Sequence, residues 1–84
     1  RNKDSQISVY PNPATDEITI DYPKNLAAET IDLIRILDGN GRAVLEIKNH
    51  PKDQPVSVEG ISRGSYILKV NSGGIEFSSK LLIQ

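Results

Sequence analysis

The chain has 84 residues, with 10 Lys and Arg against 11 Asp and Glu, a formal net charge of −1 and no cysteine. This length fits one small domain, and the balanced charge without blocks of one sign argues against nucleic acid and anionic membranes as partners. Because cysteine and long apolar runs are both absent, the sequence predicts no disulfide framework, no thiolate metal site, no lipid-spanning segment and no signal peptide.

The chain opens with a polar stretch that leads into a short strand. Residues 1–6 carry no apolar side chain, and we interpret them as a linker into the domain. Residues 7–10 alternate in polarity, which predicts the first strand. Pro11, Asn12 and Pro13 follow. Because the two prolines lack ladder donors and have a fixed φ, they predict a rigid extended turn.

Two more strands are predicted before the middle of the chain. Residues 18–22 alternate with period two and are closed by Pro23, whereas residues 24–29 predict an irregular crossing segment or a single helical turn. Residues 31–37 form the third strand, but its apolar positions change parity after Leu33. This change indicates either a strand buried on both faces or a bulge near residue 33, and we favour the bulge.

The sequence is organised around a predicted hairpin in its middle. Asp38 and Gly41 occupy the first and fourth positions expected of a type I turn that ends in a glycine bulge. The resulting three-residue loop places Arg42 opposite Asp38 and Val44 opposite Ile36, so two apolar side chains share one face. A two-residue loop would place the alanine before Val44 there instead, and we favour the three-residue loop.

The segments after this hairpin are shorter and richer in turns. Residues 42–48 form the fourth strand, and the polar stretch 49–55, which contains two prolines, is expected to be a loop. Residues 56–58 form a short fifth strand. The turn at 60–64 carries one apolar anchor, Ile61, and it leads the chain into its last hairpin.

Two strands joined by a turn at 71–74 complete the prediction. The expected cross-strand pairs are Val70 with Ile75, Leu68 with Phe77, and Tyr66 with Ser79. Alternation in the last strand predicts a core face made of Ile75, Phe77, Leu81 and Ile83. It predicts an outer face made of Glu76, Ser78, Lys80, Leu82 and Gln84. Leu82 is therefore an apolar side chain on a polar face.

Seven short strands without a helix predict an all-β fold, an antiparallel β-sandwich of immunoglobulin-like kind without its disulfide or tryptophan. The apolar parity of the strands gives the expected core. Its members are Val9, Ile18, Ile20, Ile34, Ile36, Val44, Ile61, Tyr66, Leu68, Val70 and Phe77.

Residue chemistry points away from an enzyme, a cofactor or a metal site. His50 lies in the polar loop without a cysteine, so we interpret it as a solvated loop histidine. Residues 38–41 resemble the start of a calcium loop, but Arg and Ala follow where the loop needs Asp or Asn and then Gly. Asp16, Glu17 and Asp21 lie in or beside an exposed strand, so we interpret them as a solvated face.

Four short motifs occur in a fixed order, and together they resemble one family. They are Tyr10-Pro-Asn-Pro-Ala14, Leu37-Asp-x-x-Gly41-Arg-x-Val44, Gly64-x-Tyr66-x-Leu68-x-Val70 and Lys80-Leu-Leu-Ile83. The chain is similar over residues 7–84 to the C-terminal sorting domain of the type IX (Por) secretion system. That resemblance implies an immunoglobulin-like sandwich attached to the C-terminal side of a cargo protein of Bacteroidetes-type bacteria.

The resemblance also implies partners, a route and site residues. The cargo would cross the periplasm, contact the outer-membrane translocon, a shuttle protein and a sortase, and reach the outer-membrane surface or the extracellular space. The residues closest to export would be Lys80, Leu81, Leu82 and Ile83. The other motif residues would be mostly structural: Pro11, Asn12, Pro13, Asp38, Gly41, Arg42, Gly64 and Tyr66. We expect Lys80 and Leu82, with the backbone of their strand, to form part of the recognised surface.

One other function is compatible with the same fold. A structural or adhesive immunoglobulin-like module of a cell-surface protein would need no different sandwich, because one fold serves many roles. A spacer of this kind tolerates an extension after Gln84, whereas a terminal sorting signal requires Gln84 near the true end. A third possibility, a small hydrolase, has no supporting residues.

Overall fold

The computed structural model describes residues 7–23 and 26–84, and within them the chain forms seven strands and no helix. The predicted linker at 1–6 and part of the predicted crossing segment, residues 24–25, lie outside the described residues. One sheet has the order β1-β2-β5, with β1 at Ser8–Tyr10, β2 at Glu17–Asp21 and β5 at Val56–Ser57. The other has the order β4-β3-β6-β7, with β4 at Ala43–Pro51, β3 at Thr30–Leu37, β6 at Gly64–Ser72 and β7 at Ile75–Ile83.

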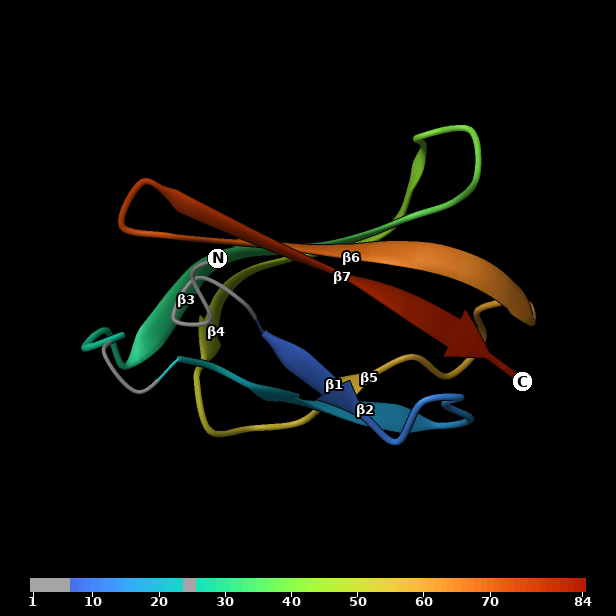
Figure 1. Ribbon diagram of the computed structural model, residues 1–84, viewed down its shortest axis with the longest axis horizontal. Helices are drawn as coiled ribbons and strands as arrows, with labels where there is room; N and C mark the ends of the chain where they lie inside the picture. Colours follow the sequence, from blue (N-terminus) through green and yellow to red (C-terminus); the bar gives the residue numbers. More distant parts are fainter. Residues whose placement is uncertain (1–6, 24–25) are drawn as a thin grey trace.

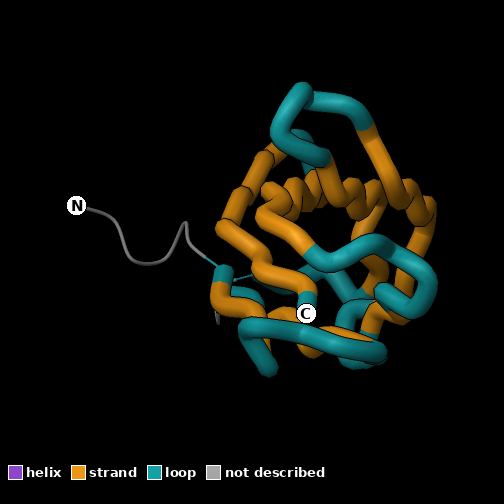
Figure 2. The backbone as a smooth tube through the Cα atoms, turned by 90° about the vertical axis from the view of Figure 1, so that its right-hand side faces the viewer, coloured by secondary structure: helices purple, strands orange, loops and turns teal. Residues whose placement is uncertain are grey.

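The two sheets lie face to face, as Figures 1 and 2 show, and all pairings between the named strands are antiparallel. Apolar side chains at alternate positions of each strand fill the space between the layers. The buried apolar residues are Ile7, Val9, Ala14, Ile18, Ile20, Ile31, Ile34, Ile36, Val56, Val58, Leu68, Val70, Phe77, Leu81 and Ile83. The prediction of an all-β sandwich is therefore confirmed.

Most of the expected core is buried, with three exceptions. Ile61 and Tyr66 are only half-buried and pack against the core from its side. Val44 is 41% exposed, so its assignment to the core is wrong. The sequence pattern found inward positions of β1, β2, β6 and β7, but in β4 it chose the wrong parity because it did not locate the point where the ladder changes register.

The central hairpin explains the exposure of Val44. The backbone N–H of Gly41 donates to the Asp38 carbonyl at 3.0 Å, and Gly41 has a φ of 83°, as a type I turn with a glycine bulge requires. Leu37 then pairs with Ala43, but Ile36 pairs with Leu45. Neither the predicted Val44 partner nor the alanine alternative lies opposite Ile36, because one extra residue of β4 turns Val44 outward.

The predicted bulge near residue 33 of β3 is wrong. The pairing with β4 keeps one register from Thr30 to Ile36 and shifts only between Ile36 and Leu37, and the pairing with β6 is regular from Leu33 to Leu37. Ile31 is nevertheless buried along with Ile36, so apolar side chains at both odd and even positions of β3 are buried. β3 is an inner strand that pairs with β4 and β6 along its two edges.

β4 is longer than predicted, and this changes the setting of His50. The strand continues to Pro51, so His50 lies in it opposite Ile31 rather than in a loop. Its imidazole is half-buried, and Nε2 lies 3.0 Å from the carbonyl oxygen of Gln54. The interpretation of His50 as a solvated loop residue is therefore wrong, although its contact is still that of a structural histidine.

The last hairpin has the predicted faces but a different register. Gly73 and Gly74 form a two-residue loop, and Ser72 pairs with Ile75. The observed pairs are Val70 with Phe77, Leu68 with Ser79 and Tyr66 with Leu81, two positions from the prediction. A shift of two residues leaves every side chain on its expected face. Ile75 is the exception to the predicted core face, because it lies at the hairpin tip and is 53% exposed.

Candidate functional site

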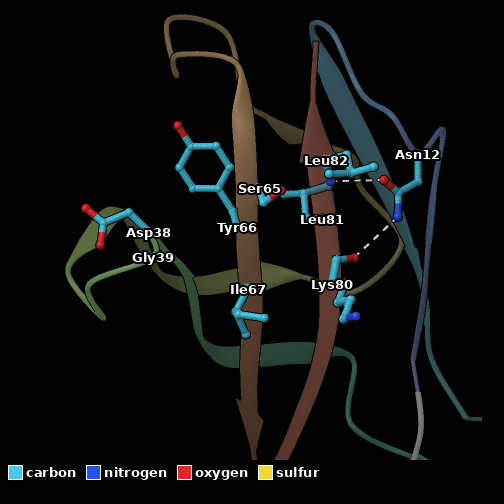
Figure 3. Close-up of a pocket in the computed structure, with 9 residues that line it drawn as sticks. All are labelled: Asn12, Asp38, Gly39, Ser65, Tyr66, Ile67, Lys80, Leu81 and Leu82. Carbon is cyan, nitrogen blue, oxygen red and sulfur yellow. Dashed lines mark hydrogen bonds between the residues drawn. The ribbon is translucent and has the colours of Figure 1, made fainter.

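A groove of about 650 Å³ lies over β6 and β7, and it brings together residues from all four sequence motifs (Figure 3). Its lining residues are Asn12, Asp38, Gly39, Ser65, Tyr66, Ile67, Lys80, Leu81 and Leu82. These residues come from the Pro-Asn-Pro segment, the central turn, the start of β6 and the end of β7. Segments up to 70 positions apart in the sequence therefore share one concave surface.

The edge segment, residues 11–14, packs along the outer edge of β7. The Asn12 side chain donates through Nδ2 to the Lys80 carbonyl at 3.3 Å, and its Oδ1 accepts from the Leu82 backbone N–H at 3.0 Å. Two residues later the pairing is made by the backbone. The Ala14 N–H donates to the Leu82 carbonyl, and the Ala14 carbonyl accepts from the Gln84 N–H, each at 2.8 Å. The first and last sequence motifs thus form a single hydrogen-bonded unit.

The residue types of the edge segment suit this contact. An asparagine amide carries a donor and an acceptor side by side, so it can satisfy one N–H and one C=O of a strand edge as a backbone residue would. Prolines have no N–H and cannot continue a ladder, so the flanking Pro11 and Pro13 keep the segment from becoming a full strand. The β7 backbone near Leu82 is therefore already paired. The side chains of β7 near Leu82 are therefore the part of this edge that is open to a partner.

The central turn forms one end of the groove. Asp38 Oδ1 accepts from the backbone N–H groups of Arg42 and Asn40, each at 2.9 Å. These two hydrogen bonds, that from Arg42 first, favour the ionised carboxylate and hold the pKa of Asp38 below its usual value. Asp38 and Gly41 thus shape the turn, and Gly39 lines the groove beside them.

Tyr66 closes the groove beyond the end of β3. Its hydroxyl donates to the carbonyl of Ser62, and its ring is half-buried near the core. The ring lies beside Gly64, where an added Cβ would stand 3.6 Å from it. The structural role that the resemblance implies for Gly64 and Tyr66 stays a prediction.

Comparison with known families identifies the fold family of this arrangement. The family described as "Secretion system C-terminal sorting domain" matches residues 8–84. The chain belongs to this type IX secretion family. No curated protein matches the chain. The predicted membership is confirmed, and the domain is a C-terminal sorting signal for export across the outer membrane to the surface or the extracellular space, in a family that is not one of enzymes.

The terminal motif of the sorting domain, residues 80–83, divides into two pairs. Leu81 is 1% exposed and Ile83 is also buried, so both face the space between the sheets. Lys80 and Leu82 face outward, and Leu82 is 46% exposed. Only the second pair offers side chains to a partner, whereas the first holds the strand in place.

Sequence reasoning missed three residues that line the groove, Gly39, Ser65 and Ile67, and only Ile67 of these is a large apolar side chain. Ile67 faces outward from β6, is 36% exposed, and pairs with Lys80 of β7. The sequence analysis followed only the inward parity of this strand, which is shared by Tyr66, Leu68 and Val70. Ile67 could have been found as the residue opposite Lys80, but identifying this pair requires the correct register of the last hairpin.

The part of the chain that the structure describes contains no cluster of three or more His, Asp or Glu side chains suited to a metal ion. In residues 7–23 and 26–84 there is also no helix of the length and hydropathy needed to cross a membrane. The described groove offers apolar contact, one ammonium group and one carboxylate, which are the elements of a binding surface.

We expect Asn12→Asp to destabilise the sorting domain by about 1 to 2 kcal/mol. The substitution keeps the acceptor for the Leu82 N–H but replaces the Nδ2 donor with a carboxylate oxygen facing the Lys80 carbonyl. Urea denaturation measures the loss, and hydrogen exchange at the Leu82 and Gln84 amides should become faster. The same amide-to-carboxylate change at exposed Gln54 should remain within about 0.5 kcal/mol. Equal effects at both positions would contradict the pairing.

Proposed function

We propose that this sorting domain carries a covalently attached cargo on its N-terminal side through the periplasm and presents the β6/β7 groove to the export machinery. The observation that supports this proposal is the convergence of four separate sequence motifs on that one groove. Asn12, Asp38 and Tyr66 build this surface through their hydrogen bonds, whereas Lys80 and Leu82 leave exposed side chains on it. The translocon, its shuttle protein and a sortase that removes the domain are the proposed partners.

Within the groove, we assign the contact with the machinery to Lys80 and Leu82. Their side chains are exposed, and their strand is held at its edge by Asn12 and Ala14. Leu81 and Ile83 act indirectly, because their burial fixes the orientation of their exposed neighbours. Strand pairing at the end of β7 would first require release of the edge segment, so recognition by side chains agrees better with this structure.

A secretion assay tests the proposal. The domain is attached to a reporter that carries an N-terminal signal peptide, in a bacterium with a type IX system, and Lys80→Ser is combined with Leu82→Thr. We expect the reporter to accumulate in the periplasm while the isolated variant melts close to the parent, because neither side chain is in the core. Cell fractionation and thermal unfolding are the two measurements.

The matched control is Lys48→Ser combined with Val44→Thr. Like Lys80 and Leu82, they are one exposed lysine and one exposed aliphatic residue of the four-stranded sheet. They lie on β4, however, at the edge of the sheet opposite β7. The control reporter should be exported like the parent. Normal export of the Lys80 and Leu82 variant would remove this surface from the mechanism.

A further inference from the structure

We propose that the β6/β7 groove binds a protein segment in which an aliphatic side chain lies between a carboxylate and a cationic group. This inference rests on the proposed function, and it specifies the chemistry of the partner. The groove is the same one that collects the four motifs, and its ligand is set by the exposed aliphatic and charged groups that line it. Those groups are the aliphatic side chains of Ile67 and Leu82, the Lys80 ammonium group and the Asp38 carboxylate.

The floor of the groove is aliphatic. Ile67 and Leu82 are 36% and 46% exposed, and they come from neighbouring strands, because Ile67 pairs with Lys80 and Leu82 pairs with Ser65. Two partly exposed aliphatic side chains at diagonal positions of neighbouring strands form a contact suited to one Leu, Ile or Val of a partner. Figure 3 shows these side chains along β6 and β7.

Opposite charges lie at the two ends of this floor. Leu37, Ile67 and Lys80 are neighbours across β3, β6 and β7, and Asp38 follows Leu37. At about 4.8 Å between strands, the backbones of Leu37 and Lys80 are separated by roughly 10 Å, with Ile67 between them. The groove is therefore bipolar, with an apolar centre.

Both charges remain available in the described part of the chain. Lys69 of the same face pairs with Glu76 at 3.9 Å, whereas no ion pair of Lys80 is found among the described residues. Asp38 uses Oδ1 for the turn and is subject to the positive charge of Arg42, and no hydrogen-bond partner of its Oδ2 is found within residues 7–23 and 26–84. Charge complementarity therefore selects a partner carboxylate at the Lys80 end and a cationic group at the Asp38 end.

The other polar groups of the groove narrow the choice of ligand. The Asn12 amide is bonded on both sides to β7, and the Tyr66 hydroxyl is bonded to Ser62. The Tyr66 ring is half-buried and packs against the core. A lipid with an anionic headgroup would match Lys80 but would meet a second negative charge at Asp38. A protein segment supplies both signs, with an apolar residue between them.

Photo-crosslinking in the secreting cell tests this assignment. A benzophenone amino acid replaces Ile67 in the signal-peptide reporter, and the crosslinked peptide is sequenced. We expect the crosslink within a protein segment that has Asp or Glu on one side of the contact and Lys or Arg on the other. Lys80→Glu should then reduce export at least about tenfold, and changing the partner's carboxylate to Lys should restore it.

Controls separate this inference from the function on which it rests. Ile75 is the matched exposed isoleucine at the far tip of β7, so Ile75→Ser should export normally, whereas Ile67→Ser should fall at least about tenfold. A crosslink to lipid, a contact segment without the two charges, or parental export of Lys80→Glu would overturn the inference. Failure of the unaltered reporter to leave the periplasm would instead overturn the sorting function.

Discussion

Leu81→Ala should lower the free energy of unfolding by about 2 to 5 kcal/mol, whereas Leu82→Ala should change it by less than about 0.5 kcal/mol. The two leucines are adjacent in the terminal motif but face opposite sides of β7. Leu81 is 1% exposed, so its truncation leaves a cavity between the sheets. Leu82 is 46% exposed, so its truncation removes little burial. Urea denaturation of both variants gives the comparison.

Secretion of reporters that carry Leu82→Ala or Leu81→Ala should fall for two different reasons. Leu82→Ala should reduce secretion while the domain remains folded, because it removes half of the aliphatic floor of the groove. Leu81→Ala should reduce secretion only to the extent that it unfolds the domain. A Leu81→Met variant, which keeps most of the volume, should therefore recover both stability and export. If Leu81→Ala proved as stable as the parent, the inward orientation of this residue would be wrong.

Gly41→Val should destabilise the domain by about 1 to 3 kcal/mol. Gly41 has a φ of 83°, and a Cβ placed there would meet no atom within 4 Å, so the loss comes from the backbone conformation alone. A β-branched residue is especially unfavourable in this left-handed region. Because Asp38 lies in the same turn, the variant should also disturb one end of the groove. Chemical denaturation measures the change.

Two substitutions serve as controls for this turn. Gly39→Val places the same side chain two positions earlier, where space is also open and no positive φ is recorded, so it should be tolerated much better. Gly41→Asn should lie between parent and Gly41→Val, because asparagine enters the left-handed region more readily than other non-glycine residues. Equal losses at Gly39 and Gly41 would argue against the glycine bulge.

The two β-hairpins show how far the sequence determines the fold. In the last hairpin the side-chain period of two placed Phe77, Leu81 and Ile83 correctly, although the register was wrong by two residues. Parity survives such a shift because an even slip keeps every side chain on its face. In the central hairpin a single extra residue at Val44 reversed one assignment. Alternation therefore predicts faces well and partners poorly.

The candidate site was only half predictable for the same reason. The outward orientation of Lys80 and Leu82 followed from alternation, and the turn chemistry of Asp38 and Gly41 followed from local rules. The place of Ile67 beside Lys80 depended on register. The contact of Asn12 with Leu82 spans 70 positions, and no local pattern in a single sequence encodes a contact of that separation.

The bonds between the edge segment and residues 80–84 have a consequence for the order of events in folding. Contacts that span about 70 residues form slowly, because a large loop must close before they contribute. Until β7 takes its place beside β6, Asn12 and Ala14 lack their hydrogen-bond partners at the end of the chain, and the core lacks Leu81 and Ile83. The groove therefore forms last. A chain in which β7 has not yet paired with β6 does not present the groove, so this surface distinguishes the folded domain from the unfolded chain.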